Sequence, residues 1–330
     1  MGFAMTVLVT GAAGFIGYHV AEALLARGRA VVGVDNLNDY YEVSLKQARL
    51  GRLEAQKDFT FRKLDFADRK SMVALGAEFP GVTHVVHLGA QPGVRYSLVN
   101  PYAYVTSNVM GQVTVLELAR TLKQLRNVVY ASSSSVYGGN QKMPFAVGDA
   151  VETPQSLYAA TKRADELISH SYAHLYGMPL IGLRFFTVYG PWGRPDMAPM
   201  IFMRAILADE PIRVFNNGEM WRDFTYIDDI VAGILAAMDA PPAQKPPHKI
   251  YNLGNNKSEK LTDFIAALER ALGRKAEMRF EPMQPGDVEK TFADIETARR
   301  DLGFEPTTPI GVGVPKFVAW YKEYHGGTSR

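Results

Sequence analysis

The chain has 330 residues, of which 47% are hydrophobic and 21% charged, and its formal net charge is +2. These proportions are typical of a globular protein, and the length suits one large domain or two closely packed ones. The absence of cysteine excludes disulfides, thiolate catalysis and cysteine-ligated zinc, and it fits a reducing cytoplasm. The basic residues are scattered, and no apolar run approaches the roughly 18–20 residues of a membrane span. We therefore expect a cytoplasmic protein with no metal site and no nucleic-acid or membrane partner. The composition is compatible with an anionic small-molecule substrate, which needs only a few local cations.

Short β-branched runs alternate with segments of helical period in the first half of the chain, which is the pattern of a parallel, doubly wound α/β sheet. The expected strands are residues 6–9, 30–34, 59–63, 84–88, 127–131 and 180–185. Their nearly continuous hydrophobicity indicates burial on both faces. Helices are expected at residues 15–26, 108–123 and 158–176.

The pattern changes after about Gly190, where prolines become frequent. A helix is expected at residues 228–238, followed by a proline-rich surface loop at residues 240–247. Further helices are expected near residues 262–272 and 314–324. This second half therefore indicates a smaller, mixed α/β lobe.

Three glycines, Gly11, Gly14 and Gly17, lie between the first expected strand and the first helix. Glycine lets the backbone turn tightly and approach a diphosphate, whose charge suits the free N–H groups of a helix N-terminus. The second strand leads into Asp35, whose carboxylate would hold the adenosine ribose hydroxyls and repel a ribose phosphate, so it favours NAD over NADP. A turn capped by Asp35 is compatible with that role. The other residues expected around the cofactor are Phe15, Ile16, Asn36, Asp65, Phe66, Leu88, Ala90, Asn108, Phe185 and Val188.

Tyr158 and Lys162 are four residues apart on an expected helix and therefore share one face. An ammonium beside a phenol stabilises the phenolate, so Tyr158 could accept and return a proton. A run of four serines, Ser132 to Ser135, follows the fifth strand. Together with the dinucleotide loop, these residues predict a redox site.

In combination, these motifs resemble the extended short-chain dehydrogenase/reductase family, over nearly the whole chain. Within that family the chain is most similar to nucleotide-sugar 4-epimerases, and most closely to those acting on UDP-glucuronate. The phrases that carry the resemblance are residues 93–97 (GVRYS), 184–197 (RFFTVYGPWGRPDM) and 221–224 (WRDF). The implied fold is a Rossmann-like sheet at residues 1–189, which binds NAD and carries the catalytic residues, with a nucleotide-sugar lobe at residues 190–330. Segments around residues 223–254 are expected to return to the first domain.

The resemblance implies that Tyr158 is the general base, that Lys162 stabilises its phenolate and binds the nicotinamide ribose, and that Ser133 bonds the reacting hydroxyl. NAD would stay tightly bound and be regenerated in each turnover. The expected reaction is the reversible C4 epimerisation of UDP-glucuronate to UDP-galacturonate through a 4-keto intermediate.

The expected substrate contacts narrow the choice of sugar. Ser134 and Ser135 stand where related dehydratases and decarboxylases carry carboxylates, and Thr187 replaces an asparagine of UDP-galactose 4-epimerases. Hydroxyl groups can donate to a substrate carboxylate, which another carboxylate would repel. Arg95 is a candidate cation for the substrate, although a solvated surface position explains this residue nearly as well. Val214 and Phe215 are expected to sandwich the uracil, although packing in the core explains them almost as well. The remaining expected contacts are Arg194, Arg222 and Asp287.

Three alternatives stay open: a UDP-glucose/UDP-galactose 4-epimerase, a UDP-glucuronate decarboxylase or net dehydrogenase, and a non-catalytic nucleotide-sugar-binding protein.

The resemblance also implies a homodimer that pairs the helices at residues 108–123 and 158–176 in a four-helix interface. Val109, Val113 and Leu116 suit such a face, but burial within the monomer would give the same pattern.

Overall fold

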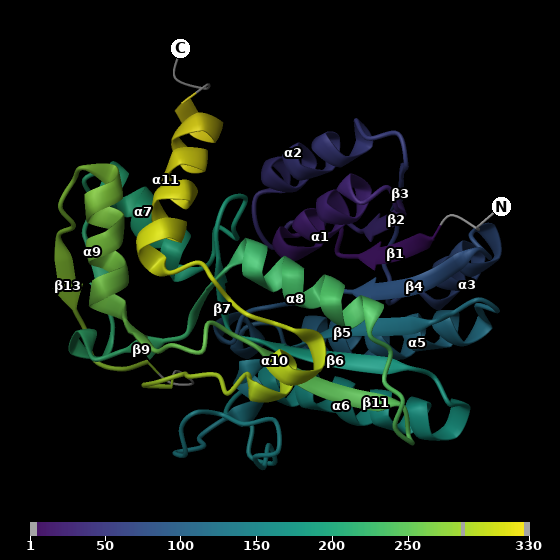
Figure 1. The fold of residues 1–330 in the computed structure, drawn as a ribbon. Helices are drawn as coiled ribbons and strands as arrows, with labels where there is room; N and C mark the ends of the chain where they lie inside the picture. The colour runs from purple at the N-terminus through teal and green to yellow at the C-terminus, as the bar shows by residue number, and fades with distance from the viewer. Residues whose placement is uncertain (1–4, 285–287, 327–330) are drawn as a thin grey trace.

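The structure, a computed structural model, describes residues 5–284 and 288–326. Its central feature is a seven-stranded parallel sheet in the order β11-β6-β5-β4-β1-β2-β3 (Figure 1). The strands are β1 (Thr6–Thr10), β2 (Ala30–Asp35), β3 (Phe59–Lys63), β4 (Val82–His87), β5 (Asn127–Ser133), β6 (Leu180–Phe185) and β11 (His248–Leu253). The expected doubly wound parallel sheet is confirmed.

Helices cover both faces of the sheet, which explains why the strands are apolar without interruption. One face carries α1 (Phe15–Ala26), α2 (Val43–Glu54) and α8 (Ile227–Asp239), and the other carries α3 (Arg69–Glu78), α5 (Gly111–Thr121) and α6 (Leu157–Tyr176) (Figure 1). Along β1, Val7 and Val9 pack into the core cluster beneath α1, whereas Leu8 packs into the cluster beneath α5. Successive strand residues thus serve opposite faces.

The helix expected at residues 108–123 differs from the structure at both ends. It is preceded by the short helices η1 (Arg95–Leu98) and α4 (Pro101–Tyr104), and then by a π-helical turn, η2 (Val105–Met110), that runs into α5. The α-helix ends before Leu122, whose backbone is extended.

The smaller lobe contains α7 (Ala198–Leu207), α9 (Leu261–Leu272) and α11 (Ile310–Gly326), of which α9 packs against both others (Figure 1). Its short strands pair two by two: β8 (Ile212–Val214) with β13 (Met278–Phe280), and β9 (Trp221–Arg222) with β12 (Glu259–Lys260). A third pair, β7 (Thr187–Tyr189) and β10 (Phe224–Tyr226), leads from the sheet into this lobe. The remaining elements are η3 (Ser134–Tyr137), η4 (Asn216–Gly218) and α10 (Glu296–Leu302).

Two elements from the second half of the sequence belong to the large sheet layer. Helix α8 packs against α1, and β11 pairs with β6 at the sheet edge. The predicted domain boundary between residues 189 and 190 stays a prediction.

Within the described residues, no helix is long and apolar enough to cross a membrane.

Candidate active site

A cavity of about 1090 Å³ opens at the carboxyl ends of the parallel strands, between the sheet layer and the smaller lobe. This is where open α/β sheets bind ligands. Most of the predicted site residues line it: Gly11, Gly14, Phe15, Ile16, Gly17, Asp35, Asn36, Phe66, Leu88, Ala90, Arg95, Ser133, Ser134, Ser135, Tyr158, Lys162, Phe185, Thr187, Val188, Arg194, Phe215 and Arg222.

The turn between β1 and α1 requires glycine. Gly11 has φ +70°, and a Cβ there would lie 2.8 Å from the Gly89 nitrogen. A Cβ on Gly17 would lie 2.0 Å from the Gly11 carbonyl oxygen. Helix α1 starts after Gly14 without a side-chain cap, so its first N–H groups are available to an anion. This geometry fits a dinucleotide diphosphate.

Asp35 holds this turn as well as lining the cavity. Its two carboxylate oxygens accept hydrogen bonds from the backbone N–H groups of Ala13, at 3.1 Å, and Leu37, at 2.8 Å. Burial raises the pKa of Asp35, against the lowering effect of the Leu37 bond. Asp65 does not line the cavity; its Oδ2 accepts from the Asn36 amide at 3.2 Å and so positions Asn36.

Asn108 is buried and also lies outside the cavity wall. Its amide bonds both backbone groups of Gln91, at 2.8 and 3.1 Å, and donates to Thr161 Oγ1 at 3.0 Å. It therefore ties the segment after β4 to α6, which carries Tyr158 and Lys162.

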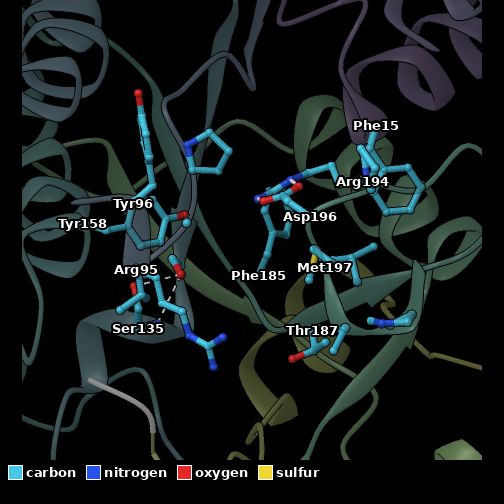
Figure 2. A pocket seen from close by; sticks show the side chains of 18 of the residues that line it. Phe15, Arg95, Tyr96, Ser135, Tyr158, Phe185, Thr187, Arg194, Asp196 and Met197 are labelled. Atoms are coloured by element: carbon cyan, nitrogen blue, oxygen red, sulfur yellow. Dashed lines mark hydrogen bonds and ion pairs between the residues drawn. The ribbon is translucent and has the colours of Figure 1, made fainter. Parts of the chain in front are cut away.

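Lys162 lines the cavity, and its ammonium is held by two hydrogen bonds. Its Nζ donates to the Ala131 carbonyl at 2.8 Å and to Asp165 Oδ2 at 3.1 Å. Burial raises the pKa of Asp165 to about 6, although the Lys162 ammonium opposes this. Tyr158 lies one turn earlier on α6 and faces the cavity across from Arg194 (Figure 2).

The serine run divides between two environments. Ser133 Oγ accepts from the N–H and the hydroxyl of Ser135, at 3.2 and 2.9 Å (Figure 2). Ser132 faces away from this pair, because its hydroxyl donates to Glu166 at 2.7 Å in a buried ion-pair network with Arg184. Ser132 thus lies within β5 and satisfies a buried carboxylate.

On the smaller-lobe side, Arg194 donates to both oxygens of Asp196, at 3.1 and 2.5 Å, and Tyr40 donates to Asp196 at 3.0 Å. Figure 2 shows this Arg194–Asp196 pair in the cavity, which Thr187 on β7 also lines. Burial works against the charge, but the Asp196 carboxylate raises the pKa of Arg194 above its ordinary value.

Two guanidinium groups make cation–π contacts with the Phe215 ring. Arg95, from the sheet layer, lies 4.9 Å from the ring centroid, and Arg213 lies 5.0 Å from it. Arg95 thus reaches across the cavity to the smaller lobe. Val214, in contrast, is fully buried in the core and does not line the cavity.

The last two predicted contacts are Arg222 and Asp287. Arg222 donates to the carbonyl oxygens of Trp221, at 2.9 Å, and Glu289, at 3.1 Å. Asp287 lies outside the described residues.

Several polar residues at the site were missed by the sequence analysis. Tyr40, Tyr41, Lys46 and Asp196 line the cavity, and Arg49 bonds the turns that build it. The dipeptide Tyr40-Tyr41 and the charges of α2 were visible, but nothing in their local spacing indicated a site.

Comparison with known proteins gives the family. The NAD dependent epimerase/dehydratase family matches residues 7–254. Protein CapI of Staphylococcus aureus is 48% identical over 97% of this chain and 99% of its own length. UDP-glucuronate 4-epimerase 4 of Arabidopsis thaliana is also 48% identical, over 99% of this chain and 77% of its own. The solved structure of UDP-glucuronic acid 4-epimerase from Bacillus cereus, in complex with UDP-glucuronic acid and NAD, is 34% identical with a TM-score of 0.90, covering 97% of this chain and all of that one. The chain therefore belongs to the NAD dependent epimerase/dehydratase family.

Proposed function

We propose that this protein catalyses the reversible C4 epimerisation of UDP-glucuronate to UDP-galacturonate through a 4-keto sugar, with NAD retained throughout the cycle. The observation that carries the proposal is a single cavity lined by Tyr158, Lys162, Ser133 and the glycine turn. Similarity over nearly the full chain to proteins named for UDP-glucuronate 4-epimerisation supports the choice of substrate.

Bound NAD supplies a reversible hydride acceptor, and the glycine turn with Asp35 would hold it. Tyr158 would take the proton from O4 as a general base and return it once the keto sugar has presented its other face. Lys162, fixed by Ala131 and Asp165, would stabilise the phenolate, and Ser133 would hold the reacting oxygen. Protons and electrons return to the same sugar, so no net redox change occurs.

The 4-keto sugar of a uronate is a β-keto acid, which loses carbon dioxide readily. Ser134, Ser135 and Thr187 offer hydroxyl donors, and Arg194 offers a guanidinium, for holding the carboxylate in an orientation that disfavours this loss. The carboxylate at Asp196 keeps Arg194 in place.

Product analysis tests the reaction. We expect NMR to show UDP-galacturonate forming from UDP-glucuronate with no added cofactor, and much slower turnover of UDP-glucose offered in parallel. Tyr158→Phe should abolish turnover while retaining bound NAD, because only the proton carrier is lost. Tyr172→Phe is the matched control, because Tyr172 lies on the same helix, α6, but outside the cavity, and its hydroxyl donates to Glu117 on α5. Near-normal epimerisation by Tyr158→Phe, or a preference for the neutral sugar, would contradict the proposal.

Thr187→Ala tests the carboxylate site. Loss of one donor should let the carboxylate turn, so the fraction of 4-keto-pentose by-product measured by NMR should rise several-fold. Thr60→Ala, on β3 away from the cavity, should leave the product ratio unchanged. An unaltered ratio in Thr187→Ala would rule out its carboxylate role.

We further propose a homodimer that acts in the cytoplasm and supplies uronate donors for polysaccharide biosynthesis. The absence of cysteine is consistent with that compartment. Exposed apolar residues on η1, α4, η2 and α6, and directly after η1, support the dimer: Leu98, Val99, Tyr102, Val105, Met110 and Leu167. Of the positions suggested from the sequence, Leu116 is fully buried within the monomer.

A further inference from the structure

Three consecutive backbone carbonyls of the smaller lobe accept hydrogen bonds from side chains of the cofactor half. His19 on α1 bonds the Pro191 oxygen at 2.9 Å. Arg49 on α2 donates to the Trp192 oxygen, through Nε at 3.1 Å and Nη2 at 2.6 Å, and to the Gly193 oxygen at 3.2 Å. These three carbonyls lie in the first half of residues 190–197, which we call the substrate loop.

The same guanidinium also reaches the cofactor loop, residues 11–17. Arg49 Nη1 donates to the Ala13 carbonyl at 3.0 Å and to the Tyr41 hydroxyl at 2.8 Å. The N–H of Ala13 donates in turn to Asp35, so both polar groups of this residue are fixed. One side chain therefore joins the two loops that face the cavity from opposite halves of the molecule.

Arg49 is fully buried, yet among the described residues no carboxylate forms an ion pair with it. Within the described residues, its hydrogen bonds go to neutral oxygens, those of three backbone carbonyls and the Tyr41 hydroxyl. Burying a charge in this way is costly unless its hydrogen bonds are satisfied. The planar, forked guanidinium can bond several carbonyls at once, which a lysine ammonium on a single stem cannot reproduce.

Contacts with residues outside the substrate loop stabilise its conformation. Trp192 has φ +59°, a conformation that costs a non-glycine residue free energy unless its surroundings impose it. Its indole packs on α11, with ring centroids 5.3 Å from Trp320 and 5.1 Å from Tyr324. Two residues further on, Arg194 and its partner Asp196 line the cavity.

We propose that Arg49 is a positioning residue that couples NAD binding to the placement of Arg194 on the substrate loop. This inference rests on the proposed function for the role of Arg194. Because ordering of one loop favours ordering of the other, NAD and the nucleotide sugar should strengthen each other's binding.

The test measures exchange of bound NAD in the holoenzyme, by chase with excess fluorescent etheno-NAD, with and without saturating UDP-glucuronate. In the wild type, we expect UDP-glucuronate to slow NAD release by about fivefold or more, within the usual range of such couplings. In Arg49→Lys the two rates should differ by less than about twofold, and the 4-keto-pentose fraction should rise. Arg62→Lys, at an exposed ion pair with Glu78, should behave as the wild type.

Tyr41→Phe provides a second variant that removes one acceptor of Arg49 and keeps the guanidinium. If Arg49→Lys does not fold, a reduced coupling in Tyr41→Phe would support the proposal. An absence of coupling in the wild type, or wild-type coupling in a folded Arg49→Lys or Tyr41→Phe protein, would overturn it. Failure of the proposed function would appear separately, as no epimer formed by the wild type.

Discussion

His87, at the end of β4, is buried, and the cost of protonating its ring in the folded state lowers the stability of the protein at low pH. Its ring nitrogen Nδ1 lies 2.6 Å from Thr10 Oγ1, and that oxygen accepts from the Gly89 N–H at 3.1 Å. Burial, aided by the positive charge of Lys162, lowers the pKa of His87 to about 3. The neutral ring thus supports the Thr10 and Gly89 contacts beneath the cofactor loop.

The sign of the pH effect follows from that lowered pKa. Between about pH 6.5 and 3, unfolded His87 binds a proton that the folded state refuses, so stability falls as pH falls, by about 1.4 kcal/mol per pH unit. In His87→Asn, whose amide oxygen can still accept from Thr10, the slope of unfolding free energy between pH 6 and 5 should be smaller by about that amount. Urea midpoints at each pH measure it. His174→Asn, at an exposed site on α6, is the control, and an equal slope in His87→Asn and the wild type would contradict the assignment.

At the scale of elements, the strands and the glycine turn were predictable and α2 was not. Strands buried on both faces give continuous apolar runs, and the turn shows its three glycines directly. On α2 the buried positions include Lys46 and Arg49, so the apolar period that marks a helix is broken. Arg49 donates to the carbonyls of Ala13 and Trp192, and both of these residues are far from Arg49 in the sequence. Only the fold brings them together.

The first turn of α6 determines where Tyr158 points. Ser156 is the N-cap, and its hydroxyl accepts from the Ala159 N–H at 3.1 Å. Ser156→Ala should cost about 1 kcal/mol of stability and lower kcat several-fold, because the turn carrying Tyr158 loosens. Asp68→Ala removes the equivalent cap of α3, which accepts from the Ser71 N–H at 2.7 Å, and should cost similar stability with kcat unchanged. Urea denaturation and steady-state kinetics measure the two effects; equal kcat values in both variants would contradict this account.

At the scale of the whole molecule, the cavity takes its walls from both halves, while the proposed dimer surface lies on helices that support one half. Asn108 projects from η2 to bond Gln91 and Thr161, and Val105 on the same turn is exposed to solvent. The π-helical turn therefore directs Asn108 inward, to the segments around the site, and exposes an apolar residue on the proposed dimer surface. Packing of a second copy would restrain the helices that carry Asn108 and Tyr158.

Val105→Arg tests this surface, with Val312→Arg as a matched control. Their exposed fractions are 49% and 48%, but Val312 lies on α11, away from the patch. Stable interfaces bury roughly 1,200–2,000 Å², and an unpaired charge at their centre is costly because it loses its water. In sedimentation velocity, the wild type and Val312→Arg should run as dimers of two 36.5 kDa chains, and Val105→Arg as a 36.5 kDa monomer. A monomeric wild type would contradict the proposed homodimer, and a Val105→Arg dimer of unchanged affinity would place the dimer interface elsewhere.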